Sequence, residues 1–129
     1  MRALLDTQVF LWWNLDVPKL SRRAFDLIGH EANDVYVSVA SAWEIGIKYA
    51  KGRLMLEDAE PGDWVPSRIA LDSLQTLSIE LSHALRAGAL PPIHRDPFDR
   101  LLIAQAQIEG LPILTSDPNI ARYDVEVIW

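Results

Sequence analysis

Short apolar runs alternate along the chain with longer segments in which apolar residues recur at helical spacing. The apolar runs, rich in aliphatic and β-branched residues, predict strands at 2–6, 34–41, 76–80, 112–117 and 125–129. The segments between them predict helices at 7–16, 22–32, 42–54, 63–74, 81–90 and 97–109, and one helical turn at 118–123. Strands that alternate with helices indicate an α/β domain with a mainly parallel central sheet flanked by helices.

The composition narrows the class of protein. A chain of 129 residues, half of them hydrophobic, has the size and core of one domain, so we expect a single domain over 1–129. With a formal net charge of −6, it would need a local basic patch or bridging cations to bind a nucleic acid. The absence of cysteine excludes disulfides and thiolate metal sites. No signal peptide or membrane-length apolar run is evident, so we expect a cytoplasmic protein without a membrane contact.

Four acidic residues fall where a predicted strand ends or a predicted helix begins: Asp6, Glu44, Asp99 and Asp117. In a parallel sheet these positions share one edge, where α/β proteins bind their ligands. Carboxylates gathered there would repel one another unless a divalent cation lay among them, and Mg²⁺ and Mn²⁺ prefer carboxylate oxygens. A cation held in this way can stabilise charge on a phosphodiester, which is the chemistry of metal-dependent nucleases.

Each acid also has a purely structural interpretation. Ser41 and Glu44 have the spacing of a capping box, and Glu44 is placed one helical turn before Lys48, with which it could pair. Asp6 and Asp117 each precede a predicted helical segment, where an aspartate is a favourable N-cap. The shared edge favours the metal site over four unrelated caps.

The stretch HRDPFDRLLIAQA at 94–106 contains two aspartates where a helix begins. Asp96 is a favourable N-cap, and Asp99 lies in the first turn, where the helix dipole favours an anion. The polar stripe of this helix contains Arg100 and Gln107, whereas Asp99 lies among apolar positions. Burial of a carboxylate is costly without a partner, which could be a backbone N–H, an arginine or a metal ion.

At these segments the chain resembles the PIN-domain ribonucleases, in particular the VapC-type toxins of bacterial toxin–antitoxin pairs. The resemblance extends over essentially the whole chain and is carried by LLDT at 4–7, SVASAWEIGIK at 38–48, DPFDRLLIAQAQIEGLPILTSD at 96–117 and VEVIW at 125–129.

The resemblance implies a function and a set of site residues. It implies an endoribonuclease that depends on Mg²⁺ or Mn²⁺ and cleaves RNA phosphodiesters with metal-activated water. It further implies a homodimer and inhibition by a cognate antitoxin protein. The metal ligands that it implies are Asp6, Glu44, Asp99 and Asp117, with the Thr115 hydroxyl beside them.

Several polar residues near these acids have two interpretations. Asp96 is either the helix cap or a further acid close to the metal. Lys48, with Lys51 and Arg53, forms either a solvated helix face or a basic strip that guides phosphates. Arg100 either contacts the substrate or pairs with Asp96.

The histidines and the overall function also leave alternatives. His30, His83 and His94 lack metal-ligand spacing and are predicted to be structural or superficial, although His94 is close in sequence to the proposed ligands. Two other functions stay open from the sequence. One is a non-catalytic interaction module with the PIN fold, in which the acids serve only as caps, and the other is a DNA nuclease.

Overall fold

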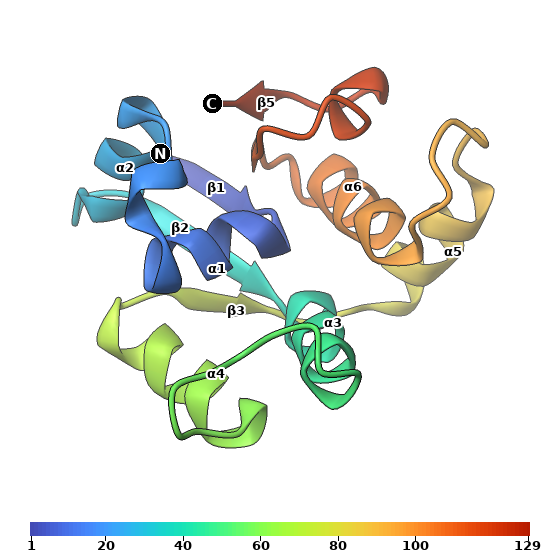
Figure 1. Ribbon diagram of the computed structural model, residues 1–129. Helices are drawn as coiled ribbons and strands as arrows, with labels where there is room; N and C mark the ends of the chain where they lie inside the picture. The colour runs from blue at the N-terminus through green and yellow to red at the C-terminus, as the bar shows by residue number, and fades with distance from the viewer.

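The computed structural model, which describes residues 1–129, contains one sheet of five strands in the order β3-β2-β1-β4-β5 (Figure 1). Every pair of neighbouring strands is parallel, which confirms the predicted α/β architecture. The strands are β1 (Arg2–Leu5), β2 (Asp34–Ser38), β3 (Gln75–Leu77), β4 (Ile113–Leu114) and β5 (Val127–Ile128). The order places β1 at the centre, between β2 and the late strand β4.

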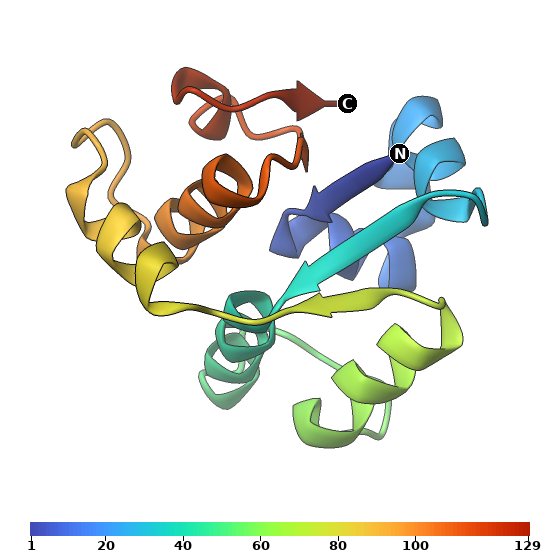
Figure 2. The ribbon, with the colours of Figure 1, turned by 180° about the vertical axis from the view of Figure 1, so that it is seen from behind.

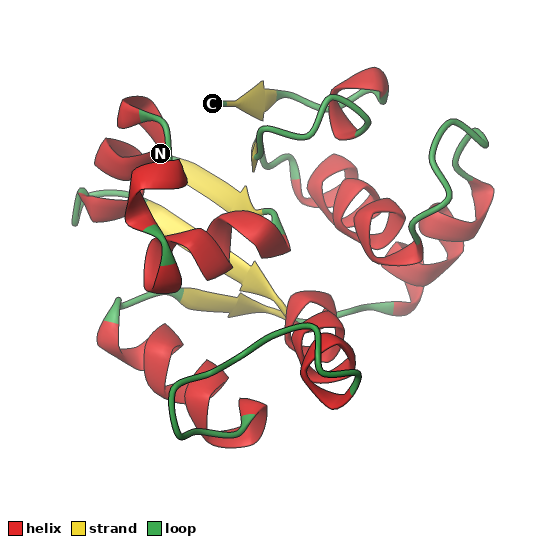
Figure 3. Cartoon of the chain, in the orientation of Figure 1, coloured by secondary structure: helices red, strands yellow, loops and turns green.

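Helices cover the sheet and connect its strands (Figure 3). They are α1 (Thr7–Leu15), α2 (Arg22–Gly29), α3 (Val39–Ala50), α4 (Pro61–Leu71), α5 (Leu81–Ala89) and α6 (Pro97–Glu109). Two short 3-10 turns, η1 (Val17–Lys19) and η2 (Ile120–Arg122), complete the set. Helices α5 and α6 lie side by side (Figure 2). None of the helices has both the length and the apolar character that crossing a membrane requires.

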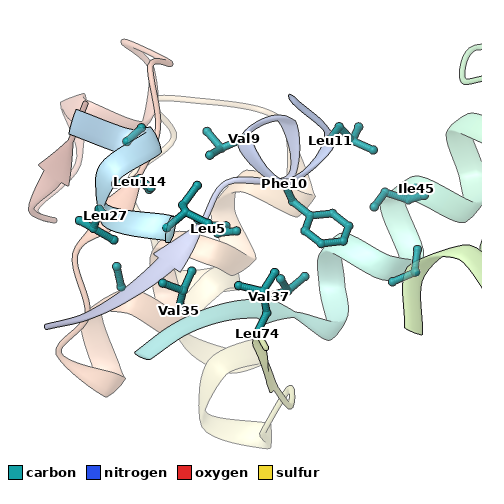
Figure 4. Close-up of a cluster of buried hydrophobic side chains, with 14 of the residues drawn as sticks. Leu5, Val9, Phe10, Leu11, Leu27, Val35, Val37, Ile45, Leu74 and Leu114 are labelled. Atoms are coloured by element: carbon teal, nitrogen blue, oxygen red, sulfur yellow. The ribbon is translucent and has the colours of Figure 1, made fainter. Parts of the chain in front are cut away.

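Successive residues of each central strand enter two different cores. In β1, Leu5 packs with α1 and α2, whereas Leu4 packs with α6 on the opposite face of the sheet. Figure 4 shows the first core, where Phe10 of α1 extends toward β2 and α3. Because both faces of the sheet are covered, its strands appear in the sequence as continuous apolar runs rather than as an alternating pattern.

The end of β2 differs from the sequence-based prediction. The strand was expected to continue to residue 41, but it ends at Ser38, and α3 begins at Val39. The Ser38 hydroxyl accepts a hydrogen bond from the Ala40 N–H at 3.0 Å, which makes Ser38 the N-cap of α3. The β-branched Val39 therefore belongs to a helix, because a local cap outweighs its preference for a strand. Strands β3, β4 and β5 are also shorter than predicted.

A buried glutamine connects α6 to the ends of two strands. Gln105 is fully buried, and its Oε1 accepts a hydrogen bond from the Ser38 hydroxyl at 2.6 Å. Its Nε2 donates to the Ser78 carbonyl, just beyond β3, at 3.1 Å. Because Ser38 also caps α3, this one side chain fixes the position of α6 relative to the beginning of α3.

We expect Gln105→Leu to lower the free energy of unfolding by about 2 kcal/mol. Leucine fills a similar volume but leaves the Ser38 hydroxyl proton and the Ser78 carbonyl without partners in the interior. Gln107→Leu is the matched control, because Gln107 lies on the same helix but is only partly buried, and water can replace its hydrogen bonds. Urea unfolding followed by circular dichroism compares the two variants. Equal losses would show that the buried network has no special contribution.

Candidate metal centre

Strands β1, β2 and β3 point toward the same side of the molecule (Figure 1), and the four acids predicted from the sequence come together in one pocket. They line one pocket of about 320 Å³, hereafter the acidic pocket. Its lining consists of Asp6, Gln8, Trp12, Glu44, Lys48, Asp96, Asp99, Ser116 and Asp117. A larger hollow of about 620 Å³ beside residues 49–60 is lined in large part by apolar side chains and contains no comparable group of ligands.

Asp6 is held by a hydroxyl group rather than by the helix that follows it. The residue occupies the N-cap position of α1, but its side chain makes no capping hydrogen bond. Instead, its Oδ2 accepts a hydrogen bond from the Thr115 hydroxyl at 2.8 Å. Burial raises the pKa of Asp6, and the nearby carboxylates of Glu44 and Asp117 add to this effect, whereas the Thr115 hydrogen bond opposes it.

Thr115 connects two of the acids. While its hydroxyl donates to Asp6, the same oxygen accepts a hydrogen bond from the Asp117 N–H at 3.0 Å. Asp117 in turn accepts from the Asn119 N–H at 2.9 Å, so its carboxylate stabilises the turn after β4. The carboxylate of Asp117 therefore has a local structural role and still lines the acidic pocket.

Glu44 has one paired and one unpaired carboxylate oxygen. Its Oε2 lies 3.2 Å from the Lys48 ammonium, as predicted from their spacing, whereas its Oε1 is buried without any hydrogen-bond partner. The predicted capping box with Ser41 is wrong, because Ser41 lies inside α3 and its hydroxyl accepts a hydrogen bond from Thr7. A buried carboxylate oxygen without a partner is costly, and a bound cation would remove that cost.

The two aspartates at the start of α6 have different surroundings. Asp96 is the N-cap, and its Oδ1 accepts hydrogen bonds from the Phe98 and Asp99 N–H groups at 2.9 and 3.1 Å. Asp99 is only 8% exposed, and its Oδ2 lies 2.9 Å from Nε2 of His94. Burial raises the pKa of Asp99 to about 7, with smaller contributions from the charges of Asp6 and Asp96.

His94 is a residue that the sequence analysis placed outside the site. One ring nitrogen of His94 and one carboxylate oxygen each of Asp99 and Asp117 all lie within 4.8 Å of one another, close enough to share a metal ion. Spacing along the chain gave no motif, because these three residues come from the loop before α6, from α6 itself and from the loop after β4. The one available signal was the position of His94 five residues before Asp99.

The two basic residues proposed for substrate binding lie in different places. Lys48 lines the acidic pocket, where it pairs with Glu44. Arg100 is outside the pocket, and the expected substrate contact or ion pair with Asp96 does not fit its surroundings. Its guanidinium donates instead to the backbone carbonyls of Ala87, Leu90 and Pro91, each at 2.9 Å. Ala87 belongs to the last turn of α5, and Leu90 and Pro91 follow that helix. Because their carbonyls accept hydrogen bonds from the Arg100 guanidinium, its N–H groups are not free to bind a phosphate.

A family comparison agrees with this geometry. The model of the PIN domain family matches residues 3–126, nearly the whole chain. The chain belongs to the PIN domain family. A comparison with curated protein sequences finds no significant match.

Solved structures show the same PIN fold over their full length. VapBC2 from Rickettsia felis, bound to a DNA fragment from its promoter, matches with a TM-score of 0.72 and 14% identity, covering 99% of this chain and 98% of that one. FitAcB from Neisseria gonorrhoeae matches with a TM-score of 0.67 and 19% identity, covering 100% and 97%. A toxin–antitoxin complex from Klebsiella pneumoniae matches with a TM-score of 0.61 and 21% identity, covering 98% and 96%.

The residues of this PIN domain fit a divalent cation. Four carboxylates converge on one pocket, and hard cations such as Mg²⁺ and Mn²⁺ prefer such oxygen ligands. The unpaired Glu44 Oε1 and the burial of Asp6 are unfavourable for a metal-free protein at neutral pH. Asp6, Glu44, Asp99 and Asp117 could therefore hold the cation.

We expect Asp99→Asn to stabilise the metal-free protein increasingly as the pH rises. The Asp99 carboxyl group has a pKa of about 7 in the folded chain, compared with the ordinary value of 3.8. Between pH 3.8 and pH 7 this carboxyl group is therefore mostly ionised in the unfolded chain and mostly protonated in the folded chain. Wild type therefore loses stability through this group as the pH rises from about 4 to about 7, and the asparagine variant lacks that contribution. In chelator at pH 7.5 the variant should be clearly more stable than wild type, and the difference should be small near pH 4.

The control for this measurement is Asp63→Asn. Asp63 also lies in the first turn of a helix, α4, but it is exposed. Urea unfolding in chelator at both pH values should show no stabilisation for this variant. If Asp99→Asn instead cost about 0.3–1 kcal/mol at pH 7.5, Asp99 would be acting only through the helix dipole.

Proposed function

We propose that this PIN domain is a metal-dependent endoribonuclease, the VapC-type toxin of a toxin–antitoxin pair. The observation that carries the proposal is the acidic pocket, in which buried carboxylates face one another and Glu44 Oε1 lacks a partner. Membership of the PIN family and the fold shared with toxin–antitoxin proteins support it. The proposed ligands of Mg²⁺ or Mn²⁺ are Asp6, Glu44, Asp99 and Asp117.

A divalent cation bound by these acids would offset their repulsion, polarise a water molecule and stabilise charge on the phosphate. The chain contributes the arrangement of the groups. Thr115 orients the carboxylate of Asp6 by hydrogen bonding, and Asp96 satisfies the first N–H groups of α6, which leaves Asp99 directed toward the pocket.

Lys48 is the basic residue that lines the acidic pocket. Its side chain is about one-third exposed, and its ammonium pairs with Glu44. In a chain with a net charge of −6, this lysine and the bound cation together would provide the local attraction that a phosphate backbone needs. Lys48 is therefore the proposed substrate-binding residue, and Arg100 is not.

We expect the purified protein to cleave RNA with Mg²⁺ or Mn²⁺ and to stop when EDTA is added. Asp99→Asn should reduce the rate at least about 100-fold, because cation positioning supplies several kcal/mol of transition-state stabilisation. Asp63→Asn should retain the wild-type rate. The measurement is the cleavage of a labelled RNA pool on denaturing gels, with single- and double-stranded DNA run in parallel.

The alternatives predict different results in the same assay. Cleavage of DNA alone would identify a DNA nuclease. Cleavage that survives both EDTA and Asp99→Asn would contradict the metal mechanism. Binding of Mn²⁺ without cleavage of any nucleic acid would favour a non-catalytic interaction module.

We further propose that a cognate antitoxin inhibits the enzyme by binding at the acidic pocket. The structural neighbours from Rickettsia felis and Klebsiella pneumoniae are toxin–antitoxin complexes, and an antitoxin Arg or Lys would complement the Asp6, Glu44 and Asp99 carboxylates as a cation does. The homodimer and the cytoplasmic location that the sequence suggests stay predictions.

We expect Mn²⁺ and the antitoxin to weaken each other's binding. If both place positive charge in the same pocket, the apparent Kd for the antitoxin should rise as Mn²⁺ increases, and linkage requires the reciprocal effect. Fluorescence titration of a cognate antitoxin, with and without saturating Mn²⁺, measures this coupling. Independent binding would place the antitoxin contact away from the acids.

A further inference from the structure

The imidazole of His94 lies beside the carboxylates of the acidic pocket. Its Nε2 lies 2.9 Å from Asp99 Oδ2, and the side chain is 21% exposed. The potential ligand atoms of His94, Asp99 and Asp117 all lie within 4.8 Å of one another. Since Asp99 and Asp117 line the acidic pocket, the imidazole approaches the pocket from beside these two acids.

The backbone around His94 is held in place by Tyr123. The His94 N–H donates to the Tyr123 hydroxyl at 2.9 Å, and that hydroxyl donates to the Pro91 carbonyl at 3.0 Å. Tyr123 is only 6% exposed and belongs to the core beneath α6. Tyr123 therefore fixes the loop before α6 at two points, Pro91 and His94.

Arg100 fixes the same loop from the helix. Its guanidinium donates to the carbonyls of Leu90 and Pro91, each at 2.9 Å, and to the Tyr123 hydroxyl at 3.2 Å. A longer contact of 3.4 Å reaches the His94 carbonyl itself. Arg100 lies on the same helix as Asp99, so the arginine fixes the position of the histidine relative to that acid. These contacts are a structural reason for an arginine directly after Asp99.

We propose that His94 Nε2 is a ligand of the cation and that it directs the site toward transition-metal ions over Mg²⁺. The inference rests on the proposed function, because it concerns the same cation and the same acids. A site made only of carboxylates suits Mg²⁺, whereas an imidazole nitrogen strengthens binding of Mn²⁺ and, more so, of Co²⁺. The histidine thereby determines which ion the pocket selects.

A different role for His94 has a different signature. If the imidazole only hydrogen bonds to Asp99, it orients that carboxylate, and its removal weakens all divalent ions alike. If Nε2 itself binds the ion, its removal weakens Co²⁺ and Mn²⁺ selectively, because oxygen ligands remain for Mg²⁺. The ratio of affinities therefore distinguishes a nitrogen ligand from a positioning residue.

The test is calorimetric titration of EDTA-treated, dialysed protein with Mg²⁺, Mn²⁺ and Co²⁺. We expect His94→Ala and His94→Asn to weaken Co²⁺ binding about tenfold or more and Mg²⁺ binding less than about threefold. His30→Asn is the control, because His30 is exposed beyond the end of α2 and should leave all three affinities unchanged. Circular dichroism verifies that each variant is folded.

A spectroscopic measurement reports on the nitrogen directly. In protein with ¹⁵N-labelled histidine, the diamagnetic ion Cd²⁺ should shift the Nε2 resonance of His94 more than its Nδ1 resonance, while His30 and His83 stay unchanged. An unshifted His94, or an equal loss of affinity for all three ions in the variants, would overturn the ligand role. If wild type bound none of the ions, the proposed metal site itself would fail, which is a separate result.

Discussion

Mutual repulsion among buried carboxylates is the constraint on which this structure depends. Asp6, Glu44 and Asp99 are each less than one-tenth exposed, and burial disfavours the charged form of a carboxyl group. Such an arrangement is stable only if the surrounding fold supplies more stability than the acids cost. Two apolar cores on opposite faces of the sheet provide that stability, and they leave the edge with the acids free for chemistry.

Hydroxyl and amide groups, rather than ion pairs, connect the elements that carry the acids. Thr115 connects β4 to Asp6, Thr7 connects α1 to Ser41 of α3, and Gln105 connects α6 to the cap of α3. These neutral groups fix the positions of the carboxylates without neutralising them. The negative charge of the pocket therefore remains available to a cation or to a basic side chain of a partner.

The elements and the four principal acids could be predicted because they follow from local patterns. Apolar runs identify the strands, and an acid directly after a strand in a parallel sheet must lie at one edge. The end of β2 could not be predicted in this way, because the Val39 side chain favours a strand and only the Ser38 cap begins the helix. The same error produced the predicted capping box, since Ser41 lies one turn inside α3.

The contacts of His94 and Arg100 could not be predicted from local sequence patterns. Their partners are a carboxylate, a tyrosine hydroxyl and a set of backbone carbonyls, and most of these contacts depend on how a loop folds over α6. No periodicity or charge pattern encodes such a loop. A prediction from type and spacing therefore assigned the arginine to the substrate or to Asp96, and the histidine to a structural or surface position.

The position of β4 in the sheet has a consequence for the growing polypeptide. The central strand β1 pairs with β4 through Leu4 and Ile113, and the Thr115 hydroxyl and the Asp117 carboxylate come only after that late strand. During synthesis, the first half of the chain contains β1 and β2 together with Asp6 and Glu44, but it contains neither Asp99 nor Asp117. A nascent chain thus has no complete acidic pocket until the ribosome has synthesised the chain through Asp117.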